Sequence, residues 1–564
     1  MDNQRFILWI TLGFLLWLSY QQWQLDFNSP EARPVSETGI LEPSLESSDS
    51  LTDSLPEIEM VDSADGGPPG GDVSTIESVD QPEPTARTEN APVVHVNTDV
   101  FDLEIGLQGG DIRGATLDAY PVAKEQPDTK VRLLSADPVD LYQLQTGLRT
   151  TQDASAPDYR AWFRTEQPAY RLADGSDELH VDLHWNDGNG VSAVKQYTFR
   201  RGEYGVLIKT TVTNASDASW TGADYLRIRR NNRKQERSML DVETFSFKGP
   251  VFYDGEKYEK LDSDEIQDGE MDGTFSNGWL ASIQHHFLTA AVPPAGQDYV
   301  YRGTVRQNAD ELLALGPGHL IQPGQSHTFE NSLFVGPKMT NQLEAMASGL
   351  RLTVDYGWLT ILSQPLFWLL NKVHGFVGNW GWAILIVTVL LKLLFFKLTA
   401  TSGKSMAKMR KLQPRIKLLQ ERYKDDREAL SKNMMEMYKR EKVNPVAGCL
   451  PMLVQMPVFL AFYWVLLESV EMRQAPFILW ITDLSSRDPY FILPVLMGAA
   501  MFGQFKLNPA PPDPVQAKVF MLMPLMMTGM MAFFPSGLVL YWFSNTLLSI
   551  AQQWRINKAI EAQG

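Results

Sequence analysis

The sequence predicts a polytopic α-helical membrane protein with six spans and one large all-β domain outside the membrane. Three observations predict this fold class. Six long apolar stretches occur, five of them in the last 210 residues. Residues 93–350 are rich in short alternating and β-branched runs. Charge divides the chain in the same way, because residues 24–354 carry a net charge of −26 and the remainder carries +9, which together give the −17 of the whole chain.

The apolar stretches are close to the length of about 20 residues that a transmembrane helix requires. The first, 6–23, carries no charge and is interpreted as an uncleaved anchor over residues 1–25. A cleaved signal peptide is the alternative, but Asp2 and Arg5 cancel and no Ala-x-Ala site follows. The other five spans are placed at 379–401, 444–470, 490–506, 516–535 and 537–554, before a tail at 555–564.

The loop at 402–443 determines the predicted orientation. It contains 13 Lys and Arg against 6 Asp and Glu, and short basic loops stay in the cytosol. The span before it therefore runs inward, which places the acidic segment 24–354 outside and both termini in the cytosol.

The acidic balance of the whole chain argues against a general nucleic-acid binder.

The outer segment divides into a tether and a folded domain. Residues 26–92 are rich in Asp, Glu, Pro, Ser and Gly and have little apolar surface to bury, so we expect them to be disordered. From 93 to 350 the pattern changes to strand-like runs such as 179–185 and 206–212, separated by turn residues such as 186–190. This spacing is typical of an antiparallel sandwich.

The sequence predicts no cofactor and no metal site. The single cysteine, Cys449, excludes an intramolecular disulfide and every metal site that needs several cysteines. The acidic run at 262–272 lacks the ligand order of a calcium loop. Two pairs of histidines have spacings that could bind metal, but an ordinary role on strands is favoured for both: His180 with His184, and His285 with His286.

Lys392 is the most informative residue. It lies 12 positions after Trp380 in the predicted span, past the bilayer midplane, where a lysine costs about 2.5–3.5 kcal/mol. Thr388 precedes it by one turn on the same face. The acidic residue of the last five spans, Glu468, lies near the outer end. Since the amine therefore has no acidic partner inside the spans, we predict a water-filled cavity, with snorkelling as the alternative. Gln455 and Asn545 could line this cavity or join helices, and its apolar walls would be Phe533, Tyr541 and Trp542.

The basic loop has helical order of its own. Its apolar residues recur at steps of three and four on both sides of Asp425-Asp426, which predicts two amphipathic helices paired as a hairpin. The basic residues lie mostly off the apolar stripe. They could contact anionic lipid or dock a ribosome, a targeting factor or a nascent chain. The candidate recruitment residues are Lys404, Lys408, Arg410, Lys411, Arg415 and Lys417.

Several short sequence motifs in residues 355–554 are similar to those of a known family. They include Ser405-Met406-Ala407-Lys408-Met409-Arg410, Glu441-Lys442-Val443-Asn444-Pro445, Gln455-Met456-Pro457, Arg473-Gln474-Ala475-Pro476-Phe477 and Phe534-Pro535-Ser536-Gly537-Leu538. With these motifs the chain resembles the YidC-type membrane protein insertases of Gram-negative bacteria. The resemblance is looser over 93–350.

The resemblance implies a fold and a site. The family has five core spans around a hydrophilic groove that opens to the cytosol and to lipid, and a periplasmic β-supersandwich. The segment 351–378 would contain an amphipathic helix on the outer membrane surface. A basic residue of the family, commonly Arg, sits in the groove. Lys392 takes its place and Thr388 matches a groove Thr, but Lys lacks the guanidinium fork.

The predicted function is that of an inner-membrane insertase and chaperone, not an enzyme, working alone or with the Sec translocon. The implied partners are nascent membrane proteins, the Sec translocon, the ribosome or the signal recognition particle pathway, and anionic lipid. A transporter or channel that uses Lys392 is the alternative, although the chain has no inverted repeat and no acidic relay. A sugar-modifying enzyme in the outer domain would need a carboxylate pair, of which the sequence gives no sign.

Overall fold

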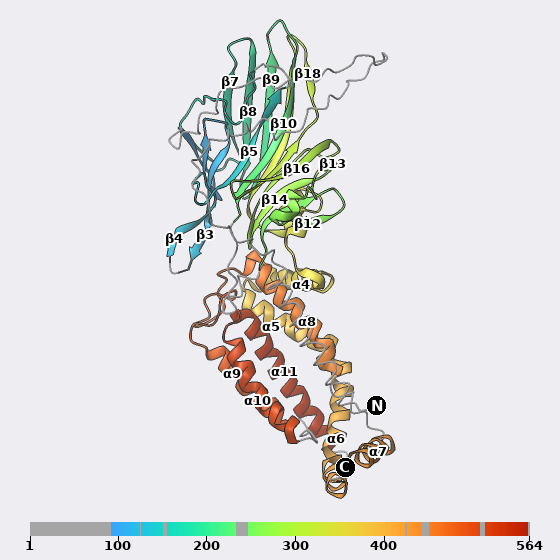
Figure 1. Cartoon of the computed structure of the whole chain (residues 1–564). Coiled ribbons are helices and arrows are strands. Elements are labelled where there is room, and N and C mark those ends of the chain that lie inside the picture. Colours follow the sequence, from blue (N-terminus) through green and yellow to red (C-terminus); the bar gives the residue numbers. More distant parts are fainter. Residues whose placement is uncertain are drawn as a thin grey trace, which may run out of the picture. The chain divides into compact units, whose positions relative to one another are not determined.

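The computed structural model describes residues 92–124, 126–150, 155–232, 246–423, 426–441, 450–507 and 514–561. The predicted N-terminal anchor and the tether up to residue 91 lie outside these residues. The described residues form a β domain followed by a helical region (Figure 1).

The β domain is built on two sheets. Within the described residues the larger sheet has eleven strands in the order β13-β16-β17-β10-β5-β3-β2-β1-β6, with β18 paired to β10 and β4 to β3. Only the β1–β6 pair in it is parallel. Its strands are β1 Val93–Asn97, β2 Phe101–Gly106, β3 Ile112–Ala123, β4 Gln126–Leu134, β5 Tyr142–Thr150, β6 Ala169–Arg171, β10 Trp220–Asn231, β13 Gly273–Ser276, β16 Asp298–Arg306, β17 Ala309–Leu315 and β18 His319–Ile321.

The second sheet has eight strands in the described residues, in the order β12-β11-β14-β15-β19-β9-β8-β7, and all its pairs are antiparallel. Its strands are β7 Glu178–Asn186, β8 Val191–Arg200, β9 Gly205–Asn214, β11 Lys248–Tyr253, β12 Tyr258–Lys260, β14 Trp279–Gln284, β15 Phe287–Val292 and β19 Ser326–Pro337. A short helix, α2 Ser263–Gln267, follows β12. The predicted sandwich is confirmed.

Alternation along the strands explains how the two sheets pack. On β7, Val181 and Leu183 are fully buried while the residues beside them are partly or wholly exposed. On β9 the same alternation buries Val206 and Ile208. Side chains on a strand point to opposite faces in turn, so each strand turns one apolar row toward the other sheet. Burying one large apolar side chain stabilises the fold by about 1.5–3 kcal/mol.

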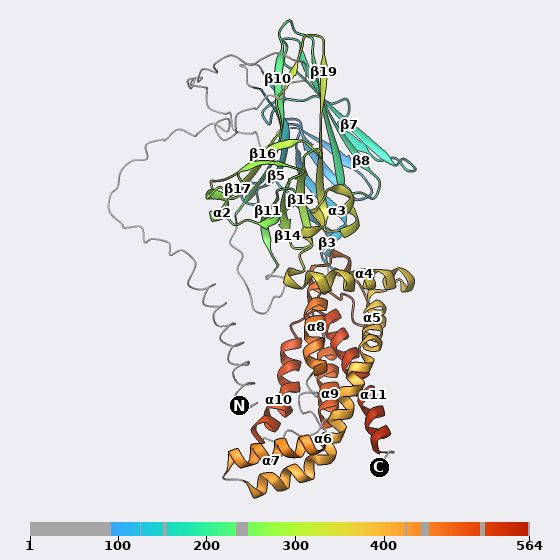
Figure 2. The same ribbon diagram turned by 90° about the vertical axis from the view of Figure 1, so that its right-hand side faces the viewer.

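The chain leaves the β domain through short helices. These are α3 Thr340–Met346, the 3₁₀ turns η3 Leu350–Thr353 and η4 Gly357–Leu359, and then α4 Thr360–Val377. Helix α4 lies across the ends of α5 Trp380–Leu394 and α8 Leu450–Glu468 (Figure 2). Its Ser363 hydroxyl donates to the Ala461 carbonyl of α8 over 3.2 Å. The opposite face of α4 exposes three large apolar side chains, Ile361, Trp368 and Phe376.

The helical bundle contains α5 and α8 together with α9 Ile492–Leu507, α10 Pro514–Met531 and α11 Ser536–Glu561. Within the described residues no single helix has both the length and the apolar character needed to cross a bilayer. Only α5 and the start of the next helix, through Ser405, meet that requirement jointly, and they are bent by 64°. The six-span count therefore stays a prediction.

The bend at Phe395 changes one predicted boundary. Helix α5 ends at Leu394, and α6 Phe396–Arg422 begins directly after the break. The boundary drawn between 401 and 402 therefore lies inside a helix, and the basic loop continues from the span without a turn. The backbone N–H of Phe395 bonds to the carbonyls of Leu391 and Leu393, which tightens the last turn of α5. No proline or glycine marks this position in the sequence.

The basic loop is a helical hairpin of α6 and α7 Arg427–Arg440, as the apolar spacing indicates. Leu412, Ile416 and Tyr438 are buried between the two helices, with methionines packed around them. Asp426 caps α7 by accepting a hydrogen bond from the Ala429 N–H over 2.9 Å. An acidic side chain at this position satisfies a free N–H group of the first helical turn.

Close packing of α9 on α10 leads to a stability prediction. A Cβ atom at Gly498 would collide with the Thr528 hydroxyl oxygen, which itself donates to the Pro524 carbonyl. We expect Gly498→Val to destabilise the bundle by about 1–3 kcal/mol because it overpacks this contact. Thermal unfolding of the purified chain measures the change. Gly529→Val on α10 is the matched control, since apart from its own helical turn nothing lies within 4 Å of its Cβ position. Equal losses in the two variants would contradict the prediction.

Candidate functional site

A small cavity lies between α5, α6, α8 and α11. It has room of about 20 Å³, slightly above the ~10–15 Å³ that one water molecule requires on the same measure. The cavity therefore accepts water or a single polar side chain, and not a polypeptide segment. Its lining residues are Thr388, Leu391, Lys392, Phe395, Leu398, Thr399, Val454, Gln455, Val458, Tyr541 and Asn545.

Lys392 contributes the charged group of this cavity. Its amine donates a hydrogen bond to the Ser549 hydroxyl over 2.7 Å, and that hydroxyl donates to the Asn545 carbonyl over 2.8 Å. Within the described residues no carboxylate forms an ion pair with this amine. An ammonium group has three donors, so a neutral partner that takes one of them leaves capacity for water or for an acidic group.

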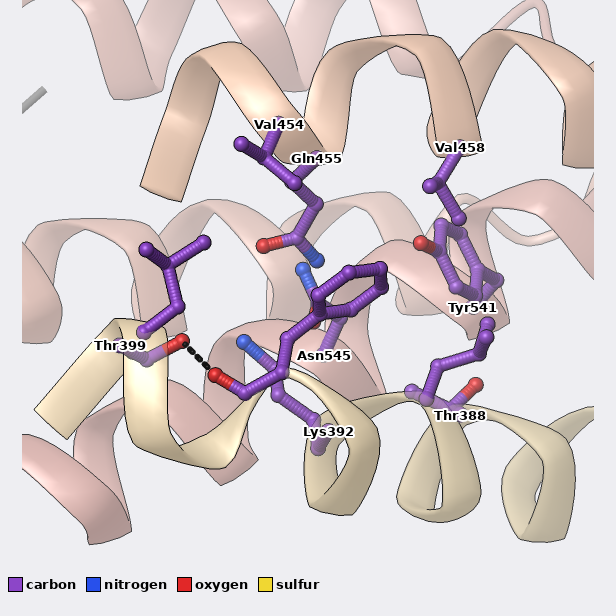
Figure 3. Close-up of a pocket in the computed structure, with 11 residues that line it drawn as sticks. Thr388, Lys392, Thr399, Val454, Gln455, Val458, Tyr541 and Asn545 are labelled. Carbon is purple, nitrogen blue, oxygen red and sulfur yellow. Dashed lines mark hydrogen bonds between the residues drawn. The ribbon is translucent and has the colours of Figure 1, made fainter. Parts of the chain in front are cut away.

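The polar side chains around Lys392 come from three helices. In Figure 3, Gln455 of α8 and Asn545 of α11 reach toward the Lys392 amine. Thr388 lines the same cavity, but it is almost fully buried and its hydroxyl donates to the Ile384 carbonyl of its own helix over 2.7 Å. Such a bond satisfies the hydroxyl without any ligand. Gln455 and Asn545 are therefore the better polar neighbours for the amine.

The predicted aromatic walls divide into two groups. Tyr541 lines the cavity and stacks on Phe462 of α8, with ring centroids 4.5 Å apart and the planes at 9°. Trp542 lies outside the lining and packs edge-on against Phe459. Phe533, after the end of α10, also lies outside and is 39% exposed. The structure thus brings together five of the seven predicted groove residues: Lys392, Thr388, Gln455, Tyr541 and Asn545.

Ser549 is the functional candidate that sequence reasoning missed. It follows Asn545 by four residues on α11, so the two lie on one helix face. That spacing is visible in the sequence, but it becomes informative only once α11 is known to pass beside Lys392. The apolar lining residues were also missed, because nothing in a mainly apolar span distinguishes Val454 or Leu398 from a neighbour that faces lipid.

The end of the bundle away from the basic hairpin is held together by backbone hydrogen bonds. The turn before α9 bonds to the start of α11: the Gly537 N–H donates to the Leu484 carbonyl over 2.9 Å, and the Ser536 N–H donates to the Ser486 carbonyl over 2.7 Å. Asp488 is buried and accepts the Leu493 N–H over 2.7 Å at the beginning of α9. These bonds join α9 and α11 at the end away from the basic hairpin.

The basic residues of the hairpin are exposed side chains on α6. Arg415 pairs with Glu441 over 2.8 Å, and exposed pairs of this kind stabilise a fold by about 0–1 kcal/mol. Arg410 belongs to α6, but its side chain lies outside the described part. The other members of the predicted recruitment surface, all exposed, are Lys404, Lys408, Lys411 and Lys417.

Comparisons with known proteins cover the whole chain. A family model described as "60Kd inner membrane protein" matches residues 372–563, and one described as "YidC periplasmic domain" matches residues 93–369. A "Membrane protein insertase YidC" from Thioalkalivibrio sulfidiphilus is 44% identical over 585 residues and covers 100% of both chains. A protein of the same name from Methylococcus capsulatus is 44% identical over 574 residues, which cover 100% of this chain and 99% of the relative.

A solved structure titled "Active YidC insertase crystal structure with the first transmembrane domain resolved" is 18% identical, with a TM-score of 0.36 over 82% of this chain and 94% of that one. Family membership rests on the sequence relatives and the family models. Together they establish that this chain belongs to the YidC family of inner-membrane proteins with a periplasmic β-sandwich domain.

Proposed function

We propose that this chain inserts nascent membrane proteins into the bacterial inner membrane. The full-length relatives at 44% identity carry the name membrane protein insertase, and this activity is not that of an enzyme. The Lys392 cavity supports a mechanism for this insertion. The amine lies inside the helical bundle with one neutral hydrogen-bond partner, so a client's acidic group gains a charge-assisted bond there.

Coulomb's law gives the strength of the attraction between the Lys392 amine and a client's carboxylate. Two opposite charges 4 Å apart attract each other by about 4 kcal/mol at an effective dielectric constant of 20. That attraction offsets part of the cost of moving a carboxylate into the bilayer. The proposal is that acidic or polar parts of a client's outer segment pass the Lys392 amine on their way across. Gln455, Asn545 and Ser549 provide further hydrogen bonds along this path.

The small volume of the cavity implies movement. A void of about 20 Å³ cannot hold a chain segment, so α8 has to separate from α5 and α11 while a client passes. The client's apolar span then leaves sideways into lipid. Helix α10 offers an apolar surface beside this exit, with Met521, Leu522, Leu525 and Met526 all more than half exposed. Burial of a client's span supplies about 0.8 kcal/mol for each CH₂ group, so the step requires no nucleotide.

In the proposed membrane topology the chain has six spans, and both termini lie in the cytosol. The contacts between α6 and α11 support the cytosolic location of the C-terminus. A Cβ atom at Gly403 of α6 would touch Ile556 of α11, and Gln552 donates to the Phe396 carbonyl over 3.5 Å. The end of α11 thus lies beside the helix that leads into the basic hairpin. The hairpin's excess of Lys and Arg favours the cytosolic side for both.

Two surfaces complete the proposal. The exposed lysines of α6 would bind clients delivered by the ribosome or the signal recognition particle pathway, and the Sec translocon would be a further partner. The same lysines would contact anionic lipid headgroups. Helix α4 would lie at the outer membrane surface with its exposed apolar face, Ile361, Trp368 and Phe376, in the lipid interface.

Reconstitution tests the proposed function. The purified chain in vesicles of bacterial lipid should insert a single-span client without nucleotide or other proteins, and protease protection measures the product. A photo-crosslinking amino acid at position 392 should attach to a stalled client, and one at Leu394, which is 73% exposed, should do so far less. Vesicles with and without the chain that insert client equally would contradict the function. Equal crosslinking from the two positions would contradict the path.

A further inference from the structure

We propose that the periplasmic β domain positions α8, one wall of the Lys392 cavity, through a buried ion pair between Lys338 and Glu468. The proposal rests on the insertase function and gives the β domain a part in it. Lys338 follows strand β19, and Glu468 is the last residue of α8. The pair therefore joins the β domain to the helix whose other end carries Gln455.

The two charges are paired, and each has a further hydrogen-bond partner. The Lys338 amine lies 3.1 Å from Glu468 Oε2, with the side chains only 2% and 6% exposed. It also donates to the Thr353 carbonyl over 3.2 Å. The second carboxylate oxygen, Oε1, accepts the Ser246 hydroxyl over 2.6 Å. Each charge would be costly to bury without the other, so the two side chains are stable in this place only while both are present.

Further bonds hold the same end of α8. His285 Nε2 donates to the Leu467 carbonyl over 3.0 Å, and burial lowers the pKa of His285 to about 4, so the ring is neutral at pH 7. In the turn after α8, the Arg473 guanidinium donates to the carbonyls of Pro121 and Val122 in the β3–β4 hairpin over 2.8 and 3.0 Å. The β domain therefore holds both the end of α8 and the turn that follows it.

The packing of this end of the helix is incomplete on one side. A cavity of about 140 Å³ lies beside the ion pair, lined by Ser246, Lys338, Trp464 and Glu468 among others. A cavity of this size with several polar lining groups has room for several water molecules, which do not hold the helix end as closely packed side chains would. It leaves space into which the helix end could move once the charge pair is lost. The ion pair and its hydrogen bonds therefore favour one position of the helix end on this side.

Helix α8 runs without a break from the ion pair to the cavity, so a change at one end affects the other. From Glu468 to Gln455 is 13 residues of α8, or about 20 Å at 1.5 Å per residue. Val454, Gln455 and Val458 of α8 line one side of the cavity, and Lys392 and Asn545 line the other. A shift or tilt at the outer end of α8 thus alters the gap that a client's polar groups enter. Lys338 and Glu468 are positioning residues, since neither touches the cavity.

A charge-swap experiment tests this inference. Lys338→Glu, Glu468→Lys and the double swap are made in the full chain, with Cys449→Ser to remove the native thiol. Spin labels at Leu390 of α5 and Met456 of α8, which are 42% and 44% exposed, report the distance between the two walls. Each single change should broaden that distance distribution and lower the insertion rate by about tenfold, a coupling typical of buried contacts.

The double swap should narrow the distances again and restore most of the insertion rate. Full recovery is not expected, because a carboxylate at 338 faces the Thr353 carbonyl. The matched control is the exposed pair Lys209–Glu330 of the same domain, 39% and 50% exposed, whose single and double swaps should leave both readouts unchanged. Unaltered distances in the single variants, or a double swap no better than the worse single one, would overturn the proposal.

A second variant keeps the test independent of folding. Replacing both residues by Met removes the charges together, which commonly preserves a fold. It should broaden the distances while the thermal unfolding temperature stays near that of the parent. If parent distances persist in this variant, the ion pair does not position α8. Spin-label distances do not depend on insertion, so failure of the parent chain to insert client would contradict the proposed function and leave this test intact.

Discussion

Lys392→Met is expected to lower the insertion rate of a client with an acidic outer segment by about ten- to a hundredfold. The variant removes an attraction of up to about 4 kcal/mol at close range, and each 1.4 kcal/mol is a factor of ten in rate. Methionine keeps most of the side-chain volume, so α5 should pack as before. The measurement is protease-protected client against time in vesicles that contain equal amounts of each variant.

Two controls separate charge from structure. Lys397→Met removes an exposed amine one turn further along on α6 and should have little effect. A client whose outer segment has Asn and Gln in place of Asp and Glu should insert nearly as well with Lys392→Met as with the parent. Lys392→Arg keeps the charge and should retain most of the activity. Normal insertion of the acidic client by Lys392→Met, at normal protein levels, would eliminate the charge mechanism.

Asp111→Leu is expected to destabilise the β domain by about 3–5 kcal/mol, the cost typical of leaving one charge of a buried pair alone. The Lys195 amine lies 3.5 Å from Asp111, and the two side chains are 1% and 3% exposed. Asp111 also accepts the Thr146 N–H over 3.0 Å. Its removal therefore leaves both an ammonium group and a backbone N–H without this acceptor in the core between the sheets.

The unfolding of the full chain, followed by tryptophan fluorescence in denaturant, measures this loss. The matched control is Glu178→Leu, which breaks an exposed pair with Arg200 over 2.9 Å and should change stability by less than about 1 kcal/mol. A midpoint for Asp111→Leu that agrees with the control would show that the buried pair adds nothing. Lys195→Met in the Asp111→Leu background should recover part of the loss, since it removes the isolated charge.

Local patterns in the sequence were sufficient for much of the fold. The alternation at 179–185 and 206–212 predicted strands that the structure has as β7 and β9. The apolar spacing on both sides of Asp425-Asp426 predicted the hairpin of α6 and α7. These predictions succeed because side-chain period reports directly which face of a strand or helix is buried. They do not require knowledge of any distant partner.

Two of the features that sequence reasoning missed depend on distant partners. Ser549 binds Lys392 across 157 positions, and Glu468 pairs with Lys338 across 130. Neither pair has a spacing that a single sequence can reveal. The bend at Phe395 was missed for another reason, because no proline or glycine stands there. Phe533 and Trp542 were assigned to the groove for their apolar character, which does not distinguish a cavity wall from a lipid-facing or helix-packing side chain.

The bonds between the 484–486 turn and the start of α11 have a bioenergetic consequence. The carbonyls of Leu484 and Ser486 hold the start of α11, and the cavity beside the Lys392 amine has room for about one water molecule. A void of that size does not admit a hydrated ion. We therefore expect vesicles that contain the resting protein to hold an ion gradient as long as vesicles without it.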